Sequence, residues 1–305
     1  MRVCVLGSAA SGGVPQWNCG CTNCHEARAG SGKVKPRTQD SAALSAGANG
    51  WFLLNASPDL RGQVERTPAL WPRGPRESPI LGVVLTSGDL DRCLGLFSMR
   101  ESHRLSIYAT RVVRRGITEN NMVVRSLQRF PGQTVWHTLE IERPERLLGP
   151  NGEDSGLEVV ARAVPGKPPI HLAGLSEPSE EDNIGVWARD MASGRVLAYV
   201  PSAGALGRHT KFLNGVDCAM FDGTFWSDDE MPRQKLGEVR ARETGHMPVG
   251  GAEGSLEALR GMNARRRLYT HINNSNPMLL EGSEERREVA RAGWELAEDG
   301  MDFEV

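Results

Sequence analysis

The sequence predicts an α/β protein in which short strands alternate with helices along 305 residues. The run Ile80–Leu85 is apolar throughout, as expected of a strand that is buried on both faces. Polar residues gather where the predicted strands end, and ligands of open α/β sheets bind beyond those ends. Since no repeat, low-complexity tract or linker divides the chain, we expect one domain over residues 1–305.

The first half of the chain holds four predicted strands. In the first predicted strand, side chains alternate in polarity and some are β-branched, and the other three are apolar runs of strand length. Turn residues follow these runs, and a helix is expected near residues 91–99. Residues 118–152 have a Pro and Gly spacing that indicates only short elements. The predicted strands are Arg2–Leu6, Trp51–Asn55, Ile80–Leu85 and Ser106–Ala109.

The second half begins with a strand at Leu157–Val164 and a hairpin whose turn is residues 191–194. A buried strand opens onto Asp222, and a later strand ends at His271. Helices are expected at residues 255–261 and 284–292, before a final strand pair that ends at Val305. The remaining predicted strands are Ile184–Arg189, Arg195–Val200, Asp217–Phe221 and Arg267–Thr270.

Composition excludes several classes of partner. The formal net charge is −2, so no basic excess exists to neutralise the phosphates of a nucleic acid. No apolar run reaches the ~20 residues that span a bilayer, so we expect no membrane partner. The N-terminus lacks the order of a secretory signal, so we expect a cytoplasmic protein. The sequence also allows the chain to form a homodimer.

Three of the six cysteines crowd into a C-x-C-x2-C motif: Cys19, Cys21 and Cys24. In a cytosolic chain such a cluster indicates metal more than disulfides, and thiolates bind zinc in tetrahedral sites. The adjacent His25 or a distant residue could supply the fourth ligand and close a structural zinc site. The alternative is three free thiols.

A second candidate site combines carboxylates and histidines from the strand ends. Asp89 and Asp91 follow the buried strand and could converge on one cation, or form a solvated acidic turn in which Asp91 caps a helix. Asp222 could ligate metal or brace its own turn. His271 could be a ligand or a hydrogen-bonded structural residue, and His246 lies on a Gly- and Pro-flanked loop that is free to reach a ligand.

Taken together, these motifs resemble the pyrroloquinoline quinone (PQQ) synthesis protein B family. The resemblance runs in order from one end of the chain to the other, and its N-terminal and His271-Ile272-Asn273-Asn274 blocks are its most specific parts. The motifs that carry it are Val5–Ala10, Gly12–Cys19, the cysteine cluster, Arg37–Gln39, Asn55–Asp59, Asp89-x-Asp91, Phe221–Thr224, Gly245-His246 and His271–Asn274.

The resemblance implies a metallo-β-lactamase-type αββα sandwich, with two mixed sheets flanked by helices. It also implies a structural zinc on the three cysteines and an active-site metal surrounded by Asp89, Asp91, Asp222 and His271. In a related phosphodiesterase a histidine three residues after the last active-site histidine closes the zinc site. Here that position is Asn274.

The implied chemistry is an iron-dependent, O2-driven hydroxylation of a tyrosine-derived PQQ precursor, with Asp91, His246 and Arg92 as candidate catalytic residues. One position departs from the family pattern D-x-D-H, because Arg92 stands where the histidine belongs. Arginine is permanently cationic and cannot ligate a metal. We therefore expect the iron, or another divalent metal, to be held more weakly or to be lost.

Two other functions fit the same residues. A metal-dependent hydrolase would use a bound ion to lower the pKa of water, although the missing histidines disfavour two metals. A non-catalytic binding or carrier protein would use Arg92 to hold PQQ or a related polycarboxylate, since Arg presents a bidentate fork to carboxylates. An older view of the family proposes transport, which the lack of a membrane segment disfavours.

Overall fold

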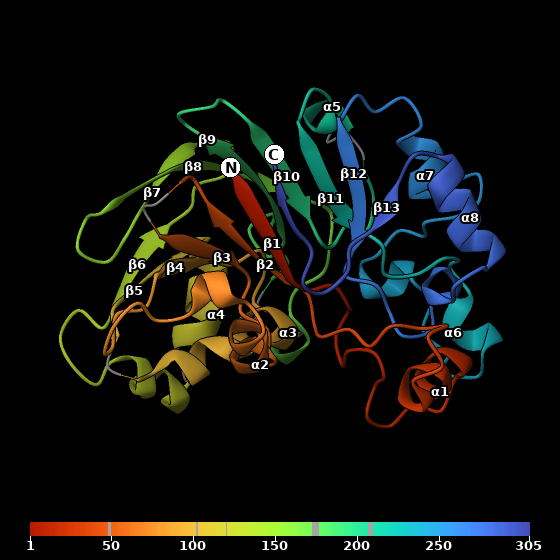
Figure 1. Cartoon of the computed structure of the whole chain (residues 1–305), viewed down its shortest axis with the longest axis horizontal. Coiled ribbons are helices and arrows are strands. Elements are labelled where there is room, and N and C mark those ends of the chain that lie inside the picture. The colour runs from red at the N-terminus through yellow and green to blue at the C-terminus, as the bar shows by residue number, and fades with distance from the viewer. Residues whose placement is uncertain (48–49, 102, 120, 173–176, 207–209) are drawn as a thin grey trace.

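The computed structural model describes residues 1–47, 50–101, 103–119, 121–172, 177–206 and 210–305. Two sheets pack face to face, and helices cover the outer side of each (Figure 1). The predicted αββα architecture of two mixed sheets is therefore confirmed. In the described part of the chain, none of the helices is long and apolar enough to cross a membrane.

The first sheet has the strand order β14-β1-β2-β3-β4-β5-β6. Strands β3 to β6 run parallel, whereas β14, β1, β2 and β3 pair antiparallel. The strands are β1 (Arg2–Gly7), β2 (Ser41–Ser45), β3 (Trp51–Leu54), β4 (Ile80–Val84), β5 (Leu105–Ala109), β6 (Thr134–Thr138) and β14 (Asp302–Glu304).

The second sheet has the strand order β13-β12-β11-β10-β9-β8-β7. Strands β10 to β13 run parallel, and β9, β8 and β7 continue antiparallel. The strands are β7 (Pro144–Leu148), β8 (Asp154–Ala163), β9 (Ile184–Asp190), β10 (Val196–Val200), β11 (Cys218–Asp222), β12 (Arg266–Thr270) and β13 (Glu295–Leu296).

The helices of the described residues are short. The α-helices are α1 (Thr22–Ala29), α2 (Leu60–Glu65), α3 (Leu90–Cys93), α4 (Arg111–Thr118), α5 (Thr210–Leu213), α6 (Glu230–Arg233), α7 (Ser255–Ala258) and α8 (Glu284–Arg291). The 3₁₀ helices are Pro68–Leu70, Leu94–Met99, Met122–Leu127, Ile170–Leu172, Arg242–Thr244 and Pro277–Leu279.

The apolar core has three layers. The middle layer combines side chains from both sheets, such as Val5 and Leu54 from the first and Val186 and Leu197 from the second. The other two layers lie between each sheet and its helices. Because β3 and β4 are apolar throughout and β11 is apolar up to its last residue, Asp222, they can be covered on both faces, as their sequence predicts.

The last two strands correct one expectation. The sequence predicts a final strand pair, but β13 joins β12 in the second sheet and β14 joins β1 in the first. The two termini consequently lie side by side, and the Val305 N–H donates to the Met1 carbonyl at 2.8 Å. Because β14 pairs with β1 on one side and β2 pairs with it on the other, β1 is not an edge strand of the first sheet.

Candidate metal centre

The predicted site residues come from segments that are far apart in the sequence and meet where strands end. Asp222 is the last residue of β11, and His271 directly follows β12. Because β11 and β12 are parallel neighbours, their carboxyl ends lie together. Asp91 belongs to α3, which follows β4 of the other sheet, and His246 follows the 3₁₀ helix Arg242–Thr244.

Asp222, His246 and His271 form one compact group. Each offers a ligand atom, and these three atoms all lie within 4.8 Å of one another. The His246 Nδ1 lies 2.8 Å from the Asp222 Oδ2, and the two imidazole rings stack with centroids 5.3 Å apart. Two histidines and one carboxylate are the donor set of non-haem Fe(II) oxygenases, so the residues fit such a metal.

Thr224 holds this group together. Its hydroxyl donates to the Asp222 Oδ1 at 2.6 Å and lies 3.0 Å from the His246 Nδ1 and 2.9 Å from the His271 Nδ1. The Thr224 N–H donates to the same carboxylate, so Asp222 closes its own turn as well as joining the group. His271 has a left-handed φ of 54°, a strained conformation that turns the chain directly after β12.

Electrostatics at Asp222 favour its charged form. The carboxylate is completely buried and also accepts the backbone N–H of Ala203 at 2.8 Å. Burial acts to raise its pKa, but His246, His271 and the Thr224 hydroxyl together outweigh burial, and the pKa of Asp222 is lowered. A buried carboxylate that stays ionised beside two imidazoles is suited to hold a cation.

Asp91 reaches this group only through His271. Its Oδ2 lies 3.1 Å from the His271 Nε2, on the side of the ring opposite Thr224. Burial acts to raise the pKa of Asp91, but the hydrogen bond with His271 and the charge of Arg92 lower it to about 2. Asp89 precedes α3, binds the Ser87 hydroxyl at 2.8 Å and belongs to neither metal-ligand group of the described residues.

Arg92 points inward and is only 3% exposed. Its Nη1 donates to the Thr86 Oγ1 at 2.9 Å, and its Nη2 lies 3.4 Å from the His271 Nε2. Its Nε lies 4.0 Å from the Asp91 Oδ2 and has no hydrogen-bond partner among the described residues. Such burial does not favour a role in which Arg92 captures an anionic ligand from solvent.

The three cysteines of the C-x-C-x2-C motif also converge. The Cys19, Cys21 and Cys24 sulfurs lie within 4.8 Å of one another, at the start of α1. The Asn274 Nδ2 lies 3.1, 3.5 and 3.4 Å from these sulfurs, respectively. His25 is exposed and is not part of the group. The structure therefore brings Asn274, rather than His25, to the open side of the thiol cluster.

Three buried polar residues near the site are absent from the sequence-based candidates. Asp40 accepts hydrogen bonds from the hydroxyls of Tyr199 and Thr270, the residue before His271. Burial raises the pKa of Asp40, while the nearby His271 acts to lower it. An isolated Asp after Gln39 carries no recognisable motif, so only the packing of the first sheet on the second reveals that Asp40 contacts the residue before His271.

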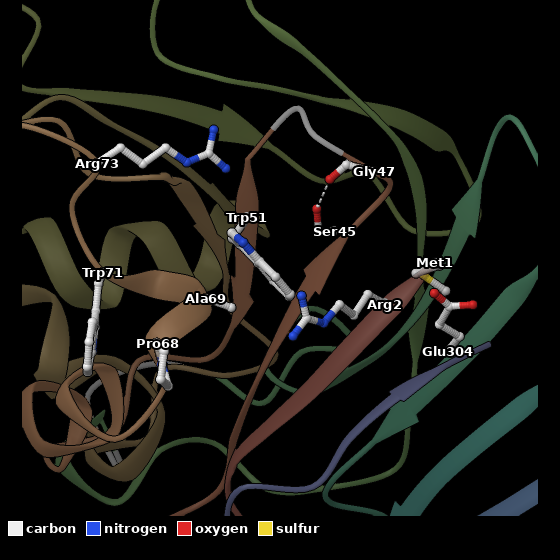
Figure 2. A pocket seen from close by; sticks show the side chains of 10 residues that line it. All are labelled: Met1, Arg2, Ser45, Gly47, Trp51, Pro68, Ala69, Trp71, Arg73 and Glu304. Atoms are coloured by element: carbon white, nitrogen blue, oxygen red, sulfur yellow. Dashed lines mark hydrogen bonds between the residues drawn. The ribbon is translucent and has the colours of Figure 1, made fainter.

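Two cavities of the described residues lie outside the metal group. A pocket of about 580 Å³ lies near β1 and β3, where Arg2 stacks over Trp51 at 5.5 Å and Trp71 and Arg73 complete the wall (Figure 2). It contains none of the metal-group residues. A larger cavity of about 720 Å³ lies beside α3, and its lining includes Leu90, Cys93, Arg115 and His171.

Comparison with known proteins places this geometry in a family. The model of the Beta-lactamase superfamily domain matches residues 50–272. Two proteins named coenzyme PQQ synthesis protein B are 42% and 43% identical over 99% of both chains; they come from Methylobacterium sp. (strain 4-46) and Methylobacterium nodulans.

Solved structures agree with the sequence relatives. The Zn(2+)-bound PqqB from Methylobacterium extorquens superposes with a TM-score of 0.92, 37% identity and full coverage of both chains. A diphosphatase from the PhnP family has a TM-score of 0.67 at 21% identity over 99% of this chain and 97% of its own, which shows the fold alone. The chain therefore belongs to the coenzyme PQQ synthesis protein B family of the beta-lactamase superfamily.

Proposed function

We propose that this chain acts in PQQ biosynthesis as a metal-dependent hydroxylase of a tyrosine-derived PQQ precursor. The observation that carries the proposal is the group formed by Asp222, His246 and His271, whose ligand atoms lie within 4.8 Å of one another. This two-histidine, one-carboxylate set is the donor set of iron oxygenases. The full-length likeness to proteins named for PQQ synthesis supports the pathway.

Iron(II) held by these residues would supply the binding and activation of O2. The chain itself keeps Asp222 buried and ionised, and the Thr224 hydroxyl holds one oxygen of the Asp222 carboxylate. Preorganised ligands of this kind need little rearrangement when an ion binds. In this arrangement His246 is a metal ligand, not a free proton carrier, and Asp91 orients His271 through its Nε2.

The cavity beside α3 is the place that we propose for the precursor. Its volume of about 720 Å³ is typical of small-molecule sites, and its residues Leu90 and Cys93 flank Asp91 and Arg92 in the sequence. Arg115 and His171 on its wall could meet the carboxylates of such a precursor. Arg115→Gln should then raise KM several-fold with little change in kcat, whereas Arg143→Gln, an equally exposed ion-paired arginine away from the cavity, should change neither.

The cysteine cluster is a separate metal site in this proposal. Zinc on Cys19, Cys21 and Cys24 would pin the loop before α1, and the side-chain oxygen of Asn274 would close the tetrahedron after its amide group rotates. The amide oxygen and nitrogen occupy nearly equivalent positions, so this needs no movement of the backbone. The PqqB from Methylobacterium extorquens is described as Zn(2+)-bound, which supports zinc here.

The hydroxylase proposal is tested by O2-dependent turnover of the tyrosine-derived PQQ precursor with the Fe(II)-loaded protein. Asp222→Ala should lower product formation at least 100-fold, measured by mass spectrometry, because it removes the only carboxylate of the group. Asp302→Asn serves as the control, since Asp302 pairs with Arg2 at the edge of the first sheet. Turnover by Asp222→Ala at the wild-type rate would refute the proposal.

A further inference from the structure

The pocket near β1 and β3 has no part in the proposed function, yet it is built like a ligand site (Figure 2). Its volume of about 580 Å³ is in the range of small-molecule sites. The segments that form its wall are the start of β1, the start of β3, residues 68–73 and the end of β14. Together they bring two indoles and two guanidiniums to one hollow: Trp51, Trp71, Arg2 and Arg73.

Arg2 and Trp51 form a part of this wall that is already satisfied. The Arg2 Nε donates to the Asp302 Oδ1 at 2.8 Å, and its Nη2 lies 2.5 Å from the Asp302 Oδ2. The same guanidinium lies over the Trp51 ring at 5.5 Å, and Trp51 is only 5% exposed. These two residues therefore offer a ligand neither a free charge nor an open indole face.

Trp71 and Arg73 differ from that pair, because both remain available. Trp71 is 49% exposed, but its indole N–H donates to the Glu65 carbonyl at 3.1 Å, so the ring faces solvent in a fixed orientation. The Arg73 guanidinium is exposed and has neither a hydrogen bond nor an ion pair within the described part of the chain. A rigid aromatic ring loses little conformational entropy when a ligand covers it, and a free guanidinium can hold a carboxylate through two hydrogen bonds.

The other charges of the pocket determine the sign of the ligand. Glu304 is the carboxylate of the lining, and Figure 2 shows it on the side of Trp51 and Arg2 that is opposite to Arg73. Glu304 lies near enough to Arg2 to stabilise the charge of that guanidinium. On the side of Trp71, the positive charge of Arg73 would repel a cation and attract an anion.

We propose that this pocket is a binding site for an aromatic carboxylate, whose rings stack on Trp71 and whose carboxylate pairs with Arg73. Stacking on a tryptophan and a bidentate guanidinium–carboxylate pair are each favourable, and the ligand class follows from their occurrence in one hollow. The pocket shares no lining residue with the metal group or with the cavity beside α3. The inference is therefore independent of the proposed hydroxylase function.

The test is isothermal titration calorimetry of the metal-loaded protein with naphthalene-2-carboxylate and with its neutral analogue naphthalene-2-carboxamide. Wild type should bind the carboxylate at least about 10-fold more tightly than the amide, because only the carboxylate pairs with Arg73. Arg73→Gln should abolish this preference, and Trp71→Ala should weaken the binding of both compounds. Arg111→Gln is the matched control, since Arg111 of α4 is also exposed and without an ion pair among the described residues but lies outside the pocket.

A wild type that binds neither compound, or that binds both equally, would overturn the inference. So would a preference for the carboxylate that survives in Arg73→Gln. If Arg115→Gln rather than Arg73→Gln abolished the preference, the naphthoate would occupy the cavity beside α3 and the inference would also be wrong. Failure of the proposed function is measured separately, by the turnover of Asp222→Ala.

Discussion

The Thr224 hydroxyl donates to the Asp222 carboxylate and lies 3.0 and 2.9 Å from the Nδ1 atoms of His246 and His271, so it fixes the orientation of the carboxylate between the two imidazoles. Thr224→Val keeps the shape and removes the hydrogen bonds, so we expect metal affinity at this group to fall about 10- to 100-fold. Chelator competition with cobalt measures this affinity. Thr118→Val, whose hydroxyl bonds only within α4, is the control. Equal affinities in the two variants would contradict the role of Thr224.

Glu230 is a completely buried carboxyl on α6 that accepts the Ser275 hydroxyl and the Trp226 N–H. Burial raises its pKa from an ordinary value of 4.5 to about 7. As pH rises, the unfolded chain loses the Glu230 proton near pH 4.5, whereas the folded chain keeps it until about pH 7. The free energy of unfolding therefore falls progressively between about pH 4.5 and pH 7 and is lowered by the full amount above pH 7. The loss amounts to about 3 kcal/mol.

Glu230→Gln removes this titration and leaves the shape of the side chain. We expect the unfolding free energy of the variant, relative to wild type, to increase by about 3 kcal/mol between pH 4.5 and pH 7.5. Urea unfolding at several pH values measures the difference, and a constant offset between the two proteins cancels in it. Parallel stability curves would show that the Glu230 carboxyl titrates near its ordinary value.

At the scale of elements, the loop after β12 connects both candidate metal groups. His271 begins this loop, and Asn274, three residues later, faces the cysteine sulfurs. Asn23 of α1 also donates to the carbonyls of Asn274 and Asn276, both at 2.9 Å. Helix α1 and its cysteine cluster therefore brace the loop that presents His271.

Asn274→Ala tests this bridge. We expect the affinity of the cysteine cluster for zinc to fall about 10- to 100-fold, because the open side of the three sulfurs loses its polar neighbour. His25→Ala should keep wild-type affinity, since His25 is exposed and outside the cluster. Zinc release to a colorimetric chelator measures both. A larger effect of His25→Ala would instead make His25 the fourth ligand.

Elements with strong apolar runs were predictable, and weakly patterned ones were not. Strands β4 and β11 agree with their predicted ranges to within one residue at each end. Strand β2 was missed because its sequence, SAALS, consists of Ser and Ala residues around a single Leu and has no β-branched or aromatic residue. Strands β6 and β7 lie in the segment whose Pro and Gly spacing indicated only short elements.

Within the group of Asp222, His246 and His271, the sequence could place only the residues that stand at the end of a strand. Asp222 and His271 stand directly at the ends of predicted strands, so the sequence places them at one sheet edge. Asp40 and Thr224 act through neighbours that are distant in the sequence, and no local pattern carries that information. The inward direction of Arg92 likewise follows from Thr86 and Asn55, not from its motif.

At the scale of the whole molecule, the two sheets bring the site together. Asp91 follows a strand of the first sheet and His271 a strand of the second, so their contact depends on the apolar layer between the sheets. Leu54 is fully buried in that layer. Leu54→Ala should lower the unfolding free energy by about 2–5 kcal/mol.

Urea unfolding measures this cost. Leu94→Ala is the matched control, because Leu94 is 41% exposed and should change stability by less than about 0.5 kcal/mol. Equal effects of the two substitutions would mean that the packing between the sheets does not contribute to stability as described.

In the proposed function, one metal ion binds to Asp222, His246 and His271, independently of the cysteines. The most direct measurement is the metal content per chain of wild type, Cys21→Ser, His246→Ala and the double variant, each loaded with zinc and separated from free ions. We expect two ions in wild type, one in each single variant and none in the double variant. Two ions in His246→Ala, or a wild type whose only ion is lost in Cys21→Ser, would contradict the claim.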